Sequence, residues 1–124
     1  MKAFLKNYRQ SPRKVRLVAD LVKGKGLPQA LAELDFLSKR AGDPIKKLIK
    51  SAAANAKINF GTSEENLFIK SITVDKGHVM KRYQPASRGR AHPIRKKMSN
   101  VAVTLESREP KQKLPKVAKK TTKK

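Results

Sequence analysis

Several residue types are absent or scarce in this 124-residue chain, and each absence excludes some classes of protein. The chain has no cysteine and no tryptophan, and only 9 of its residues are Asp or Glu. The lack of cysteine excludes a disulfide framework and thiolate metal sites, and it fits a reducing compartment. No apolar run approaches the length of a membrane-spanning helix, and no signal-peptide core follows Met1. We therefore expect a cytoplasmic protein with no membrane partner.

The chain is instead rich in positive charge. It carries 31 Lys and Arg residues and a formal net charge of +22, and every part of it is basic. Self-repulsion on this scale opposes compaction unless a polyanion or counterions neutralise it. We therefore expect an obligate nucleic-acid partner.

Three segments place apolar residues at helical spacing behind proline-containing start signals. The first helix is predicted to begin with Ser11 as N-cap and Pro12 in its first turn, the second at Pro28, and the third after the cap Asp43. The third should run to Gly61, and its alanines indicate either close packing or simple helix propensity. The side chains expected to face inward are Val15, Val18, Leu21, Val22, Ala30, Leu31, Leu34, Leu37, Ile45, Leu48, Ile49, Ala52, Ala53 and Ala56.

Alternating hydrophobicity predicts three strands, at residues 2–8, 67–75 and 101–105. Three helices packed on a small antiparallel sheet give an α+β fold. The length allows one domain, which we place at residues 1–108 with an extended hairpin at 76–102. The Lys-rich tail at 109–124 has few apolar residues, so we expect it to be disordered unless it is bound to RNA.

Residues 78–100 are expected to form a protruding β-ribbon. This segment contains seven Lys or Arg, no Asp or Glu, and a turn signal at 85–89. Its apolar residues (Val79, Met80, Ala86, Ala91, Ile94 and Met98) are too scattered to form a face. Each arm would reach roughly 30 Å. Because an isolated two-stranded ribbon is marginal in water, a polyanion must hold it in place.

The candidate nucleic-acid contacts are basic residues in two places, the start of the first helix and the ribbon. Near the helix they are Arg9, Arg13, Lys14 and Arg16, and on the ribbon they are Lys81, Arg82, Arg88, Arg90, Arg95, Lys96 and Lys97. The positive end of the helix dipole adds to the attraction of the first group for phosphate. Arg88, Arg90 and Tyr83 could also stack on unpaired bases, although Tyr83 could equally serve strand packing.

The sequence contains no recognisable arrangement of catalytic or metal-binding residues. His78 and His92 lie fourteen residues apart with no nearby carboxylate to orient either ring, which argues against general-base or metal roles. The turn from Gly24 to Gly26 lacks the preceding strand and the Lys-Ser/Thr ending of a phosphate-binding loop. We expect no enzyme activity, no cofactor, no metal and no small-molecule substrate.

Five short motifs resemble one known family in their order and spacing. They are Ser-Pro-Arg-Lys at 11–14, Ser-Ala-Ala-Ala-Asn-Ala at 51–56, Val-Asp-Lys-Gly at 74–77, Met-Lys-Arg at 80–82 and Gly-Arg-Ala at 89–91. From residue 2 to about 106 the chain is similar to the bacterial form of large-ribosomal-subunit protein L-twenty-two. The chain differs from the usual pattern of that family at Ala86 and at His92 and Pro93.

The resemblance implies a structural constituent of the large ribosomal subunit. Its partners would be large-subunit (23S) rRNA, neighbouring ribosomal proteins and the nascent polypeptide in the exit tunnel. The globular part would sit near the outer end of the tunnel, aid early subunit assembly and send the hairpin inward to line the tunnel wall. The implied tunnel-lining residues are Met80, Lys81, Arg82, Tyr83, Arg88, Gly89 and Arg90.

Two other classes of basic protein remain as alternatives. A chromatin-type DNA-binding protein would be equally basic, and the motif at 11–14 resembles minor-groove motifs of such proteins. However, a single copy at a helix start is better explained as a cap. A secreted heparin-binding or membrane-active protein would need an export signal and a cationic amphipathic face, and we find neither.

Overall fold

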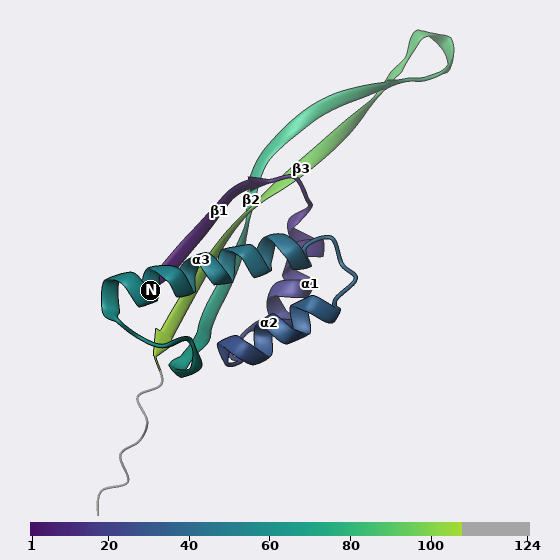
Figure 1. The fold of residues 1–124 in the computed structure, drawn as a ribbon. Coiled ribbons are helices and arrows are strands. Elements are labelled where there is room, and N and C mark those ends of the chain that lie inside the picture. The colour runs from purple at the N-terminus through teal and green to yellow at the C-terminus, as the bar shows by residue number, and fades with distance from the viewer. Residues whose placement is uncertain (108–124) are drawn as a thin grey trace, which may run out of the picture.

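The structure, a computed structural model, describes residues 1–107 and has the predicted α+β architecture (Figure 1). The sheet is antiparallel with the strand order β1-β3-β2. The elements are β1 (Lys2–Tyr8), α1 (Pro12–Val22), α2 (Leu27–Phe36), α3 (Gly42–Phe60), the 3₁₀ turn η1 (Glu64–Asn66), β2 (Leu67–Pro85), the 3₁₀ turn η2 (Ser87–Gly89) and β3 (Ala91–Ser107). The predicted tail at 109–124 lies outside the described residues.

Helix α1 begins where the sequence predicts, with Pro12 in its first turn. Ser11 occupies the predicted N-cap position, although its side chain makes no cap hydrogen bond. Val15, Val18 and Val22 are buried as expected. Leu21 is exposed, and Ala19 lies in the core in its place. The inward stripe is thus narrower and built from smaller side chains than the sequence predicted.

Helix α2 begins at Leu27, one residue before the predicted Pro28, and ends before Leu37. Ala30 and Leu34 are buried as predicted, whereas Leu31 and Leu37 are only partly buried against the core. No helix within residues 1–107 combines the length and the apolar character needed to cross a membrane.

Helix α3 begins earlier than predicted. Its N-cap is Ala41, whose carbonyl accepts a hydrogen bond from the Ile45 amide at 3.3 Å, so Asp43 lies in the first turn and is not the cap. The six predicted core residues, from Ile45 to Ala56, are all buried, which supports a packing role for the alanines. Gly61 ends the helix in the left-handed region at φ 63°, a conformation that glycine adopts without strain.

The sheet buries one set of alternate side chains. Two rows cross it, Ala3–Val103–Ile72 and Leu5–Val101–Val74, and all six residues belong to the hydrophobic core or pack against it. The predicted alternation is therefore confirmed. The predicted bounds of β1 are confirmed. Strands β2 and β3 extend beyond the core segments predicted at 67–75 and 101–105, since β2 continues to Pro85 and β3 begins at Ala91. The alternation of apolar residues ends where the strands leave the hydrophobic core. The backbone pairing of β2 with β3 continues beyond that point.

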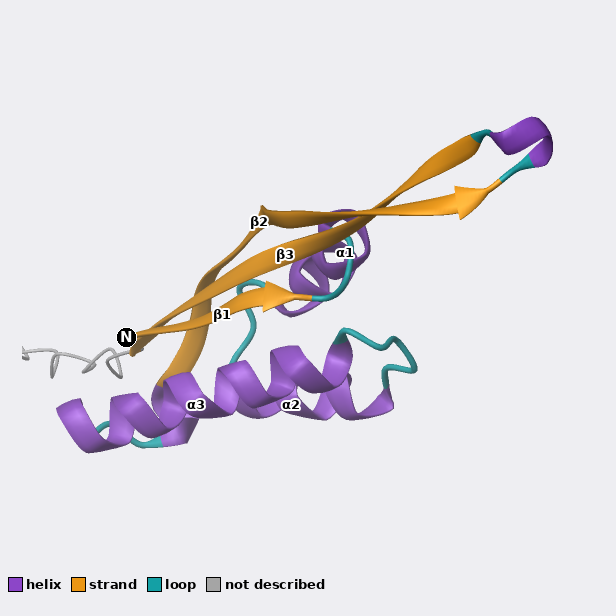
Figure 2. Cartoon of the chain, turned by 90° about the horizontal axis from the view of Figure 1, so that it is seen from above, coloured by secondary structure: helices purple, strands orange, loops and turns teal. Residues whose placement is uncertain are grey.

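A β-bulge marks the point where the ribbon leaves the sheet. Lys76 pairs with Ser99 and Val79 with Lys97, so Gly77 and His78 together oppose the single residue Met98. A Cβ at Gly77 would lie 3.2 Å from the Met98 carbonyl carbon, which is closer than packed atoms normally approach. Such bulges bend a strand and increase its twist, and Figure 2 shows β2 and β3 twisting around each other as they extend beyond the helices.

Met98 itself departs from the sequence prediction. Only 6% of its side chain is exposed, although the ribbon was expected to bury nothing. Met98 lies directly opposite the bulge, where Gly77 packs against its backbone and Cβ. Beyond the bulge, the side chains from Lys81 to Lys97 are mostly exposed, and none of them is buried.

Candidate nucleic-acid interface

The ribbon carries its basic residues on two paired arms. Pairing runs from Val79–Lys97 to Pro85–Ala91, and it places Lys81 directly opposite Arg95. Like charges in that position destabilise a strand pair. In the free ribbon, repulsion between Lys81 and Arg95 therefore opposes strand pairing, and an anionic partner would reduce this repulsion.

The tip of the ribbon is a tight turn that presents two arginines. The Ala86 amide donates to the Arg90 carbonyl at 2.8 Å, and the Arg90 amide donates to the Ser87 carbonyl at 3.3 Å. Arg88 and Gly89 both have positive φ values, 59° and 68°. A left-handed arginine is uncommon, because its Cβ crowds the backbone there.

A cleft of about 700 Å³ lies where the base of the ribbon meets the start of α1. Seven of its lining residues are Lys or Arg, and none is Asp or Glu. The lining residues are Arg9, Gln10, Ser11, Lys14, Arg40, Met80, Arg82, Arg95, Lys96, Lys97 and Met98. A concave surface of one charge sign focuses the electrostatic potential and favours an anionic ligand.

Hydrogen bonds at the end of β1 hold two sides of this cleft together. Asn7 adopts a left-handed conformation with φ 55°, and its amide donates to Asn100 Oδ1 on β3 at 2.8 Å. The Gln10 amide then donates to the Tyr8 carbonyl at 2.8 Å, which turns the chain toward α1. The Tyr8 hydroxyl donates to the Arg40 carbonyl at 3.2 Å and so anchors the loop between α2 and α3.

The cleft gathers about half of the predicted contact residues and leaves the others outside. Those that line it are Arg9, Lys14, Arg82, Arg95, Lys96 and Lys97. Arg13, Arg16 and Lys81 are not among the lining residues, and Arg88 and Arg90 lie at the far end of the ribbon. Tyr83 is 69% exposed on the ribbon, where its ring is open to a partner.

Sequence reasoning did not predict several of the lining residues as contacts, among them Arg40 and Gln10. Arg40 lies in the loop before α3, and Gln10 is a neutral residue between β1 and α1. Arg40 adjoins a single basic residue, Lys39, and Gln10 carries no charge, so neither stands out in the sequence. Only the tertiary packing of the α2–α3 loop against β1 reveals them.

Arg16 has a structural role that its charge did not indicate. Its Nε and Nη2 atoms both donate to the Val74 carbonyl, at 3.1 and 2.8 Å. The side chain thereby ties α1 to β2 at the level where β2 leaves the core.

We expect Arg16→Gln to lower the free energy of unfolding by about 1–2 kcal/mol, because two hydrogen bonds from a charged donor are lost at a partly buried position. Urea unfolding of the free protein measures this change. The variant should leave the salt dependence of nucleic-acid binding unaltered. A reduced salt dependence with unchanged stability would show that Arg16 contacts phosphate.

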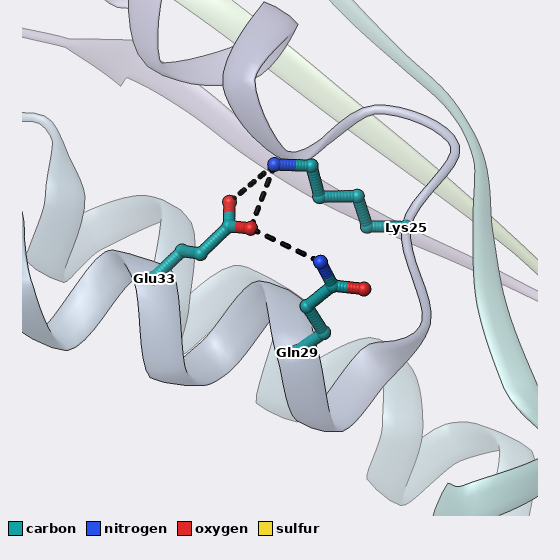
Figure 3. Close-up of polar contacts among 3 residues, drawn as sticks. All are labelled: Lys25, Gln29 and Glu33. Atoms are coloured by element: carbon teal, nitrogen blue, oxygen red, sulfur yellow. Dashed lines mark hydrogen bonds and ion pairs between the residues drawn. The ribbon is translucent and has the colours of Figure 1, made fainter.

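The cations of the cleft and ribbon have no carboxylate partners among the described residues. The three ion pairs within residues 1–107 all lie elsewhere: Lys25–Glu33, Lys46–Asp35 and Lys70–Glu106. Figure 3 shows the first, in which Lys25 Nζ lies 2.6 Å from Glu33 Oε2 and Gln29 donates to the same carboxylate. That contact links the α1–α2 loop to α2. Within residues 1–107 the cations of the cleft and ribbon therefore have no carboxylate to neutralise them, although Arg82 donates hydrogen bonds to the Lys81 carbonyl at 2.8 Å and to Met80 Sδ at 3.8 Å.

Comparison with known proteins identifies the family. Residues 3–106 match the family model described as Ribosomal protein L22p/L17e. The chain is 49% identical over 108 residues to the large ribosomal subunit protein uL22 of Herpetosiphon aurantiacus, covering 87% of this chain and 96% of that protein. It is also 49% identical over 107 residues to uL22 of Mycoplasmopsis agalactiae, covering 86% and 94%, and 45% identical over 105 residues to uL22c of Marchantia polymorpha, covering 85% and 88%. The chain belongs to the uL22 family.

Membership of the uL22 family settles the coarse function. The chain is a structural constituent of the large ribosomal subunit, it resides in the ribosome, and it is not an enzyme. This membership decides against the chromatin-type and the secreted alternatives. The predicted identity of the family is confirmed.

Proposed function

We propose that the chain binds large-subunit (23S) rRNA through the cleft and the ribbon, aids early subunit assembly, and lines the peptide exit tunnel with its hairpin. The cleft supports this proposal most strongly, because seven cations with no acidic neighbour converge there from three separate parts of the chain. An uncompensated cluster of this kind matches the phosphate backbone, whose neutralisation releases counterions and supplies much of the binding free energy.

The shape of the interface favours folded RNA over a DNA duplex. RNA is recognised mainly through its shape, phosphates and 2′-hydroxyls, together with unpaired bases. A thin ribbon can enter spaces between RNA helices, where its two arms meet phosphates on both sides. The rRNA contacts in this proposal are Arg9, Lys14, Arg40, Arg82, Arg95, Lys96 and Lys97 in the cleft, with Arg13, Lys81, Arg88 and Arg90 beyond it.

The assembly and tunnel roles follow from the length of the ribbon. Its tip lies roughly 25 Å beyond the bulge at Gly77, at about 3.3 Å per strand residue. One molecule can therefore contact RNA segments that are far apart, which would help to bring them together early in assembly. We infer that a ribbon with no core of its own lies against RNA, and that its exposed Tyr83 side chain and the exposed backbone at Gly89 face the nascent polypeptide. Met80 lines the cleft at the base of the ribbon and is not part of this exposed surface. Neighbouring ribosomal proteins complete the set of proposed partners.

A competition experiment tests the proposal. The full chain should bind deproteinised large-subunit rRNA in preference to a mixed-sequence DNA duplex of equal phosphate concentration, and the preference should persist as salt is raised. Nonspecific charge attraction would give equal competition by both nucleic acids at every salt concentration. That result would contradict specific rRNA binding.

Truncation after residue 107 should leave the domain folded, because all buried residues of the core cluster lie within residues 3–105. Removing the lysines of the tail should weaken rRNA binding mainly by loss of screened electrostatic attraction. Circular dichroism checks the fold, and rRNA affinity at low and raised salt checks the binding. Loss of folding, or failure to enter subunits at ordinary salt, would show that the tail is structural.

A further inference from the structure

We infer that the cleft between α1, the α2–α3 loop and the base of the ribbon receives one unstacked nucleotide of the rRNA, and that Gln10 pairs with the edge of its base. This inference rests on the proposed rRNA binding and specifies what the cleft binds. It concerns three kinds of lining group: the cations, the side chains of Met80 and Met98, and the amide of Gln10.

The volume and shape of the cleft fit a single nucleotide. About 700 Å³ falls within the range of sites that enclose a small organic molecule. An RNA duplex can lie across the mouth of such a cleft but cannot enter it. Proteins that recognise particular RNA positions commonly bind bases that have been displaced from the stack.

The lining has groups that match both parts of a nucleotide, the charged phosphate and the flat base. Cations can bind the phosphate, and an arginine plane such as that of Arg82 or Arg95 can stack on a base. Met80 adds a polarizable thioether, a group that makes favourable contacts with aromatic rings, and its sulfur lies 3.8 Å from Arg82 Nη2. Met98 is almost fully buried and adds apolar surface at the base of the cleft. A surface built only for phosphate would have no need of this apolar part.

Gln10 provides the independent observation. Its Oε1 atom is enclosed and has no hydrogen-bond donor among the described residues. An unmet acceptor of this kind lowers the stability of the free protein. Gln10 lines the cleft, and rotation of its side chain would be needed to turn the enclosed oxygen toward a bound base. A base edge with adjacent donor and acceptor groups can then pair with both the carbonyl oxygen and the amino group, as side-chain amides do with adenine.

The test compares Gln10→Leu with Lys14→Gln in the full chain, using deproteinised large-subunit rRNA as the probe. Leucine keeps the bulk of the side chain but cannot form hydrogen bonds. We expect Gln10→Leu to weaken rRNA binding about three- to tenfold with an unchanged salt slope, because a neutral contact is lost. Lys14→Gln should lower the salt slope by about one unit. The thermal midpoint of free Gln10→Leu protein should not fall, since the substitution removes an unsatisfied acceptor.

Chemical probing gives the second measurement. Dimethyl sulfate and a carbodiimide, which together report on all four bases, should show at least one base protected by the wild-type protein and exposed again with Gln10→Leu. Backbone protection from hydroxyl radicals should stay the same.

The possible outcomes separate this inference from the proposed function. If Gln10→Leu keeps wild-type affinity and base protection while Lys14→Gln lowers the slope, the cleft binds phosphate alone and the inference is overturned. A lower thermal midpoint that accounts for the whole loss of binding would also overturn it, because Gln10 would then be a structural residue. If neither variant changes rRNA binding, the proposal that this cleft binds rRNA is contradicted as well.

Discussion

Replacing Lys14 and Arg95 together by glutamine is expected to lower the affinity for large-subunit rRNA about ten- to hundredfold at physiological salt. The two residues face the same cleft from α1 and from β3, and neither has a carboxylate partner within residues 1–107. Loss of two charged contacts should also lower the salt slope by about two units. Filter binding across a series of salt concentrations measures both quantities.

A matched control removes the same charge from another surface. Lys47 and Lys50 are exposed on α3 and do not line the cleft, so Lys47→Gln with Lys50→Gln should have a much smaller effect. Equal losses in the two double variants would mean that total charge governs binding. The cleft would then have no special role.

Deletion of residues 80–82 is expected to remodel the exit tunnel while the globular domain still folds and enters subunits. Met80, Lys81 and Arg82 pair with Lys96, Arg95 and Ile94, so the deletion leaves three residues of β3 without partners. Because three is an odd number, side chains between the cut and the tip exchange faces. The tip should shift by roughly 10 Å, at about 3.3 Å per residue.

Density maps of subunits that carry the deletion would show the position of the tip. The response to antibiotics and arrest peptides lodged in the tunnel should change with it. A subunit with a wild-type tunnel outline and wild-type responses would refute the tunnel-lining role of the ribbon.

Two control variants separate register from charge. Deleting residues 94–96 as well restores the pairing of Val79 with Lys97 and of Tyr83 with Pro93 in a shorter ribbon. Substituting Leu, Gln and Gln for residues 80–82 keeps the register but removes two cations. We expect the substitution to weaken rRNA binding and to leave the tip in place.

The sequence by itself determined the elements and the charge of this protein. Helical periodicity identified the core face of α3 from Ile45 to Ala56, and alternation identified the inward residues of the sheet, because both patterns record local geometry against one core. The basic composition of the ribbon was sufficient to indicate a polyanionic partner, because charge depends on residue type alone. The uL22 motifs, being local, could also be recognised in the sequence.

Only the tertiary structure determined the position of the cleft and the residues that line it. Lys14, Arg40 and Arg95 lie far apart in the sequence, and they meet because Asn7 turns the end of β1 and Tyr8 anchors the α2–α3 loop. The same packing diverts Arg16 to the Val74 carbonyl, a contact that no local pattern encodes. The net charge follows from the sequence alone. Long-range packing decides which basic side chains gather in the cleft and which form hydrogen bonds within the protein.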